Sequence, residues 1–150
     1  MTGLGDLYQD MILDHNKRPR NFGRVPDANR SARGHNPLCG DQITLTLKVD
    51  GDRIQDIAFE GQGCAISKAS ASLMTSAVKG MSRSEAEALF DVFRKMVTGE
   101  PPSPEERKAI GKLEVFSGVS EFPARVKCAI LAWHTLKGAL QSPGNTVTTE

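Results

Sequence analysis

Residues 43–59 place the strongest constraint on the fold, because their apolar side chains alternate in the way that paired strands require. From position 43 to position 49, apolar residues occupy every second place, with Thr or Lys between them. This period of two predicts a half-buried strand. The Asp-Gly-Asp sequence at 50–52 predicts a turn, and the apolar residues at 54, 57 and 59 predict the return strand of an antiparallel hairpin. The Asn-, Arg- and Pro-rich segment 19–38 is expected to be mostly irregular, with room for a short strand before Pro37.

Helical periodicity dominates the remainder of the chain. Apolar residues recur at intervals of three and four, which predicts helices at about 4–16, 64–79, 83–97 and 123–140. Ser-x-x-Glu capping boxes precede the third of these, and Ser103-Pro104 starts a further short helix. The apolar residues of 113–119 are expected to pack as a connecting segment. Strands followed by helices predict an α+β fold in two layers, with a small antiparallel sheet of about three strands against four to five helices.

The length of 150 residues suits a single domain with a core large enough to fold without disulfide bonds. We expect this domain to span 1–150, with order from about 4 to 141 and a loose tail over 142–150. No internal repeat interrupts it.

Charge and hydropathy exclude several partner classes. The chain has 19 basic and 18 acidic residues, a net charge of +1, which argues against bulk electrostatic binding of nucleic acid. The longest apolar stretch, 128–133, is far too short to cross a membrane. Three widely spaced cysteines do not form a disulfide framework, and no signal peptide precedes them, so we expect a reducing cytoplasmic location.

The three cysteines are the candidates for chemistry, and each admits a structural alternative. In Cys39-Gly40-Asp41, the glycine would let a thiolate and a carboxylate reach one centre, or the aspartate would only cap local amides. Cys64 follows Gly-Gln-Gly and opens a helix, where the dipole favours a thiolate that ligates metal, attacks or carries sulfur. The alternative is a small core residue at a strand–helix junction.

Cys128 lies on the last predicted helix, with Arg125 one turn before it and Lys127 beside it. Cationic neighbours lower the pKa of a thiol, but packing alone would also explain a cysteine here. His35 is weighed as an additional ligand because it precedes Cys39 by four residues. Three thiolates with the Asp41 carboxylate would complete a tetrahedral metal site, although spacing alone leaves their convergence open.

Three motifs in order resemble the IscU/SufU superfamily of iron–sulfur cluster assembly proteins. They are Asn36-Pro37-Leu38-Cys39-Gly40-Asp41, Gly61-x-Gly63-Cys64-Ala65-Ile66-Ser67, and Arg125-x-Lys127-Cys128-Ala129-x-Leu131-x-Trp133. The resemblance extends over about 5–141. It favours the SufU-type branch, since Lys127 replaces the histidine that IscU-type proteins carry before the third cysteine. The helix and Pro-rich loop around 83–104 also fit an insertion of that branch.

The resemblance implies zinc held by Cys39, Asp41, Cys64 and Cys128, with a SufS-type, pyridoxal-phosphate-dependent cysteine desulfurase as partner. It implies that Cys39 accepts sulfur as a persulfide and that downstream assembly proteins receive it. This would make the protein a zinc-dependent sulfurtransferase. Arg125 is the candidate for contact with an acidic group of the partner or for orienting a ligand, and Lys127 is noted beside it.

Two other functions stay open from the sequence. The same thiolates suit iron as well as zinc, so the protein could be a scaffold on which an Fe–S cluster is built and then transferred. A closed structural zinc site without chemistry would use the same ligands.

Overall fold

The computed structural model describes residues 3–141 and 146–148. Its elements follow in the order α1 (Gly3–Lys17), β1 (Arg30–Asn36), β2 (Asp41–Asp50), β3 (Arg53–Gln62), α2 (Ala65–Val78), α3 (Arg83–Val97), α4 (Pro104–Ile110), the 3₁₀ helix η1 (Gly111–Glu121), α5 (Pro123–Gln141) and β4 (Thr146–Thr148). The predicted α+β class, with five helices and an antiparallel sheet, is confirmed.

The sheet has the strand order β3-β2-β1-β4. β2 pairs antiparallel with both β1 and β3, and the short β4 adds to the outer edge of β1 in parallel. The predicted hairpin is β2–β3. The segment 19–38 is less irregular than expected, because the strand allowed for before Pro37 is β1, which takes up seven of its residues. β4 is the described part of the tail expected to be loose, and the rest of that tail lies outside the described residues.

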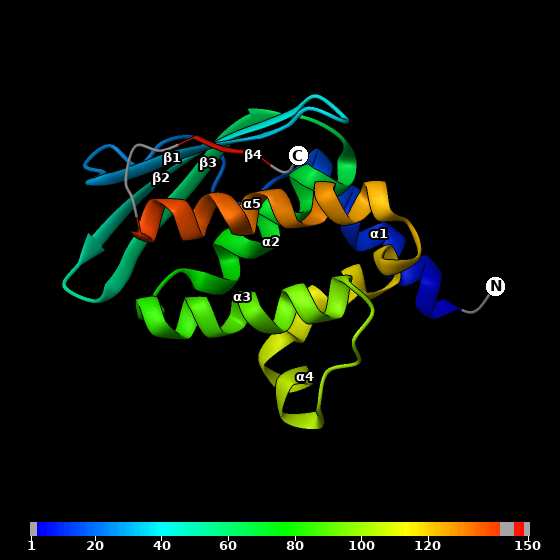
Figure 1. The fold of residues 1–150 in the computed structure, drawn as a ribbon. Helices are drawn as coiled ribbons and strands as arrows, with labels where there is room; N and C mark the ends of the chain where they lie inside the picture. The colour runs from blue at the N-terminus through cyan, green and yellow to red at the C-terminus, as the bar shows by residue number, and fades with distance from the viewer. Residues whose placement is uncertain (1–2, 142–145, 149–150) are drawn as a thin grey trace.

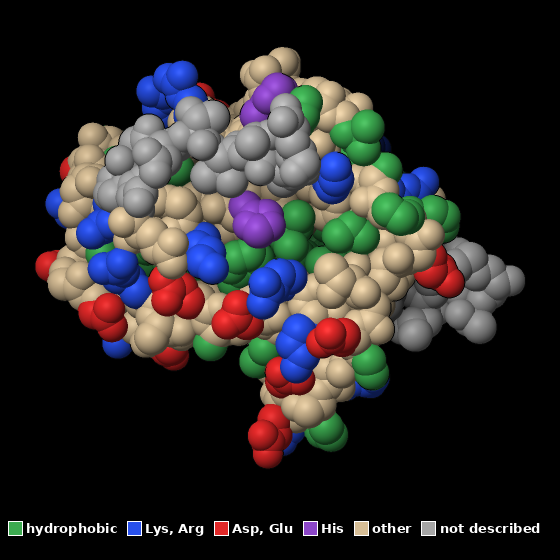
Figure 2. Space-filling view, in the orientation of Figure 1, with side chains coloured by type: hydrophobic (Ala, Val, Ile, Leu, Met, Phe, Trp, Pro, Cys, Tyr) green, Lys and Arg blue, Asp and Glu red, His purple; other side chains and the backbone are tan. Residues whose placement is uncertain are grey.

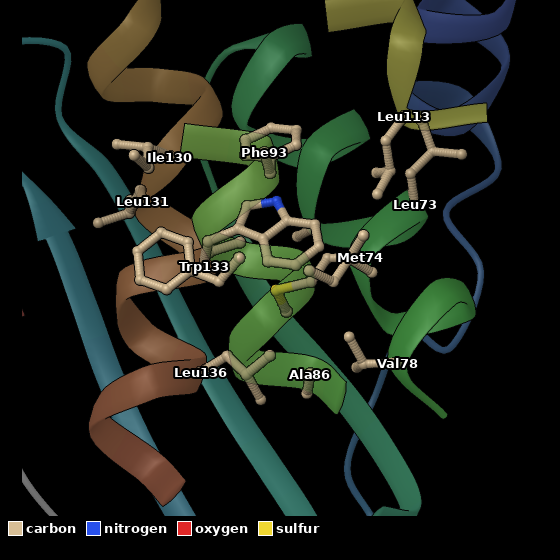
Figure 3. Packing of buried hydrophobic residues seen from close by; sticks show 14 of the residues in the cluster. Leu73, Met74, Val78, Ala86, Phe93, Leu113, Ile130, Leu131, Trp133 and Leu136 are labelled. Atoms are coloured by element: carbon tan, nitrogen blue, oxygen red, sulfur yellow. The ribbon is translucent and has the colours of Figure 1, made fainter. Parts of the chain in front are cut away.

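Helix α5 is the centre of the molecule, since it packs against β1 on one side and against α3 and η1 on others (Figure 1). This position explains its apolar run, because every residue from Cys128 to Trp133 is buried. Trp133 stacks on Phe93 of α3 with ring centroids 4.7 Å apart (Figure 3). A helix buried on several faces does not need a single apolar stripe.

Small residues let β1 lie close to α5. The side chains at Ala32, Gly34 and Asn36 are turned inward, as the alternating burial of the strand shows. A Cβ atom at Gly34 would overlap Oγ1 of Thr135 and lie 2.8 Å from Cγ2 of Ile43. The turn at the end of β1 is thereby held against the first turns of α5.

Local signals in the sequence account for the helix ends. Ser82 and Glu85 form the expected capping box at α3, and Ser103 and Glu106 form another at α4. The connecting segment expected at 113–119 is part of the 3₁₀ helix η1, whose apolar side chains pack into the core. On the face shown in Figure 2, acidic and basic side chains are interspersed.

Candidate metal centre

The turn between β1 and β2 presents the first cysteine. Asn36 and Asp41 form the last pair of these strands, and four residues connect them. The N–H of Gly40 donates to the carbonyl oxygen of Asn36 at 2.8 Å, and Gly40 has a φ of 73°, which glycine adopts without strain. The tight closure leaves the Cys39 side chain exposed at the tip.

Asp41 is a fully buried carboxylate that joins two elements. Its Oδ1 accepts the backbone N–H of Cys64 at 2.8 Å, and its Oδ2 accepts Nδ2 of Asn36 at 3.2 Å. A Cβ at Gly63 would overlap the Asp41 carboxylate, so the absence of a side chain at Gly63 permits this approach. With two N–H donors and one long contact from Cys64 Sγ at 3.9 Å, this buried carboxylate retains acceptor capacity for a cation.

Cys64 is the N-cap of α2, which confirms the prediction that it opens a helix. Its Sγ accepts the N–H of Ser67 at 3.4 Å and lies 3.9 Å from Oδ2 of Asp41. The pKa of the Cys64 thiol is lowered to about 7, mainly by a hydrogen bond from Cys128 and also by the Ser67 N–H, against the opposing effect of burial. Cys64 therefore ionises more readily than Cys128.

Cys128 lies in the first half of α5 and is 3 % exposed. Its Sγ is 3.5 Å from Sγ of Cys39, although 89 positions separate them in the chain. Asn36 Nδ2 lies 3.6 Å from the same sulfur. The pKa of the Cys128 thiol is raised, first by its hydrogen bond to Cys64 and then by burial, so without a metal this thiol keeps its proton.

The four residues named from the sequence thus meet at one end of the sheet. Ligand atoms of Cys39, Asp41 and Cys128 all lie within 4.8 Å of one another, and Cys64 adjoins them through Asp41. Tetrahedral zinc with Zn–S bonds of about 2.3 Å sets its sulfur ligands about 3.8 Å apart. The Cys39–Cys128 separation of 3.5 Å is close to that value. The ligand atoms of Cys39, Asp41 and Cys128 are placed as a zinc ion or iron would need, and Cys64 lies beside them as the fourth candidate.

The other candidates lie differently. Arg125 is exposed, with its guanidinium 4.7 Å from the centre of the Phe122 ring, at the rim of the site. Lys127 is half-buried and does not line the cavity that contains the cysteines. The idea that His35 approaches the metal is wrong. It faces the opposite way from Asn36 in the strand and lines a separate surface hollow with Arg33 and Gln42.

The three cysteines lie in an open groove of about 810 Å³ between α1, α2, η1 and the start of α5. Its apolar walls include Ile12, Leu13, Ile66, Val115, Val119 and Phe122. Leu13 and Phe122 remain 44% and 48% exposed, which is unusual for large apolar side chains. The sequence reasoning did not identify this groove, because its walls come from four distant segments.

Asn36 is the site residue that sequence reasoning used only as part of a motif. Its sequence position gave no signal, because the inward-facing phase of β1, with Ala32 and Gly34 as the other inward residues, is known only from the structure. Among the described residues, no helix is long and apolar enough to cross a membrane.

This arrangement defines a small α+β protein with a thiol-rich cluster at one end of its sheet. The sequence model described as NifU-like N terminal domain matches residues 7–140, and the chain belongs to that family. The resemblance to the IscU/SufU superfamily is therefore confirmed.

Individual relatives match along nearly their whole length. The iron–sulfur cluster assembly scaffold protein IscU of Streptococcus pyogenes serotype M1 is 47% identical, with 97% of this chain and 89% of the relative covered. The zinc-dependent sulfurtransferase SufU of Bacillus subtilis is 44% identical, covering 95% and 96%. A crystal structure described as a putative iron–sulfur cluster assembly scaffold protein for the SUF system (FiSufU), from Fervidobacterium islandicum AW-1, superposes with a TM-score of 0.83 at 36% identity, covering 88% of this chain and 95% of that one.

Proposed function

We propose that this protein is a zinc-bound sulfur acceptor in iron–sulfur cluster assembly. It takes sulfane sulfur from a SufS-type cysteine desulfurase and passes it to downstream assembly proteins. The main observation that supports this proposal is the unequal exposure of three adjoining thiols. Cys39 is exposed at the tip of a turn, whereas Cys64 is half-buried and Cys128 is buried. One ligand can thus leave the metal while the others stay.

Sulfur transfer to Cys39 needs no external oxidant or reductant. The Cys39 thiolate attacks the outer sulfur of the donor's cysteine persulfide, and a new S–S bond forms on Cys39. The S–S bond of the donor breaks, and the donor cysteine leaves as a thiolate. The groove beside Cys39 is open enough to admit a chain segment that carries the persulfide.

The chain's own residues supply the control over this step. Zinc bound here would keep the thiols ionised and shielded from oxidation. Asp41 and Cys64 lie at the junction of β2 and α2, and Cys128 lies on the central helix, so they remain in place when Cys39 moves. Clustered free thiols of this kind suit a reducing compartment such as the cytoplasm.

Two further observations support sulfur transfer. The Bacillus subtilis relative, matched over nearly the full length of both chains, is named a zinc-dependent sulfurtransferase. Lys127 stands before Cys128 and lines no part of the groove, so its ammonium group is not an alternative ligand. The fourth ligand would then be Asp41, which already lies among the thiols.

A scaffold for a nascent Fe–S cluster is the second candidate function. The Streptococcus pyogenes relative that favours it carries the name of an assembly scaffold at 47% identity. Three thiolates and a carboxylate also suit iron. Anaerobic reconstitution with iron and sulfide distinguishes the scaffold function from sulfur transfer, because a scaffold forms a stable Fe–S cluster and passes it to an apo-protein.

Persulfide mapping after incubation with cysteine and a SufS-type desulfurase tests the proposal. Wild-type protein should contain one zinc and carry sulfane sulfur on Cys39, and Cys39→Ala should accept none. Ser117→Ala, which alters the groove without removing a thiol, is the matched control. Normal sulfur acceptance by Cys39→Ala would refute the role of Cys39. Zinc retained through many turnovers with no sulfur on any cysteine would indicate a structural site instead.

A further inference from the structure

Asn36 is a buried polar side chain that the fold alone does not explain. It is 0 % exposed, at the inward-facing end of β1, and its Oδ1 has no hydrogen-bond partner among the described residues. Leaving a buried acceptor unpaired costs stability, so an apolar side chain of the same shape would suit the core better. The amide must therefore serve something other than folding.

The donor end of the amide faces the metal site. Nδ2 lies 3.2 Å from Oδ2 of Asp41 and 3.6 Å from Sγ of Cys128. A carboxylate only accepts hydrogen bonds, so this edge of the amide must be the NH₂ group, which has one proton for each acceptor. The Asn36 side chain thus links two ligand atoms that lie on different elements, β2 and α5.

We infer that Asn36 is a positioning residue that holds Asp41 and Cys128 in the geometry of the metal-bound site. Hydrogen bonds to ligating groups fix their orientation, and their loss commonly weakens metal binding. No hydrogen bond joins the Asn36 side chain to Cys39. Asn36 therefore keeps the buried half of the site assembled and leaves the exposed thiolate free to depart and return.

The backbone of Asn36 supports this distinction between the buried ligands and the exposed Cys39. The carbonyl of Asn36 accepts the N–H of Gly40 and closes the turn that bears Cys39. Asn36 thus shapes the Cys39 turn through its main chain and the two buried ligands through its side chain. The inference rests on the proposed metal site and extends it to a residue that is not itself a ligand.

Zinc affinity of Asn36→Leu, measured by competition with a chromophoric chelator, tests the inference. We expect binding about 10- to 100-fold weaker than wild type, with altered visible absorption bands of the Co²⁺-substituted protein. The free energy of unfolding of the metal-free variant should change little, because removing the unpaired Oδ1 is offset by losing the Nδ2 hydrogen bond to the buried Asp41 carboxylate. Asn36→Ala serves as a second variant if the leucine is not accommodated.

Thr135→Val is the matched control, because it removes a buried hydrogen bond within α5, from Oγ1 to the Leu131 carbonyl, without touching a ligand. It should leave zinc affinity and the Co²⁺ spectrum unchanged. Unchanged zinc affinity in both Asn36 variants, or a loss fully explained by lower metal-free stability, would overturn the inference. If wild type itself binds no zinc, the proposed function fails instead.

A second measurement locates the effect. In a Cys39→Ala background, Asn36→Leu should still weaken zinc binding by about tenfold or more, because the Nδ2 contacts to Asp41 and Cys128 do not involve Cys39. A much smaller factor would show that Asn36 acts through Cys39, contrary to the inference.

Discussion

The backbone N–H of Cys64 donates to Oδ1 of Asp41 at 2.8 Å, which ties the start of α2 to the start of β2. This bond fixes both the carboxylate and the N-terminal turn that carries the Cys64 thiol. Two of the proposed ligands are thus positioned by one contact before any metal binds. The hydrogen bond requires a glycine at position 63, because a Cβ there would overlap the Asp41 carboxylate.

Gly63→Ala should weaken zinc binding while leaving the fold intact. The new Cβ would overlap the Asp41 carboxylate, which must rotate away and lose the Cys64 N–H. We expect an affinity loss of about 10- to 100-fold by chelator competition, as for other changes that misorient a ligand. Gly118→Ala is the control, because no atom lies within 4 Å of a Cβ built there. Wild-type zinc affinity in Gly63→Ala would show that the carboxylate is not a ligand.

Gly34→Ala should lower the free energy of unfolding by about 1–3 kcal/mol, because it overpacks the contact between β1 and α5. The added methyl would overlap Oγ1 of Thr135, so removing that group should relieve part of the strain. In a double-mutant cycle with Thr135→Ala, measured by urea unfolding, the combined loss should be smaller than the sum of the single losses. Additive losses would contradict the proposed clash.

The helices and strands differ in how well the sequence predicts them. Strands β2 and β3 carry a clear alternation, and each predicted helix is present. Strand β1 has almost no apolar signature, because Ala32, Gly34 and Asn36 face a closely packed α5. Small residues selected for close approach give no hydrophobic period, so only a short strand could be suggested there.

The site shows the same limit. Glycines before Cys64 indicated a helix start, and the Cys39-Gly40-Asp41 turn follows from local chemistry. The approach of Cys128 to Cys39 depends on how α5 packs on β1, which no local spacing encodes. Its inclusion came from the family resemblance, whereas Asn36 needed the three-dimensional contacts to be noticed.

Stability should fall as the pH falls below about 6.5, the ordinary pKa of histidine, in part because of His15. The pKa of buried His15 is lowered, chiefly by burial and then by Arg20 and Lys112, while Asp14 opposes the shift. Its Nδ1 lies 2.7 Å from Oγ of Ser72 on α2. The folded state keeps the imidazole neutral and the unfolded state binds the proton more readily, so stability rises with pH across this window.

Urea unfolding of metal-free wild type and His15→Gln between pH 5.5 and 7.5 measures this contribution. One proton limits the difference in slope to about 1.4 kcal/mol per pH unit. His134 also has a pKa lowered by burial, so part of the dependence should persist in His15→Gln. Identical slopes for the two proteins would mean that His15 titrates equally in both states.

Arg125→Glu should reduce stimulation of a SufS-type desulfurase without changing zinc content. Arg125 is exposed at the rim of the groove and stacks on Phe122, so its charge is presented beside the apolar wall where a partner would dock. Rim charges act mainly on association rate, so we expect a loss of about tenfold or less that shrinks as salt is added. Lys108→Glu makes the same charge change on α4, which lines no part of the groove, and should have no effect. Equal activation by Arg125→Glu and wild type at low salt would mean that docking does not use this charge.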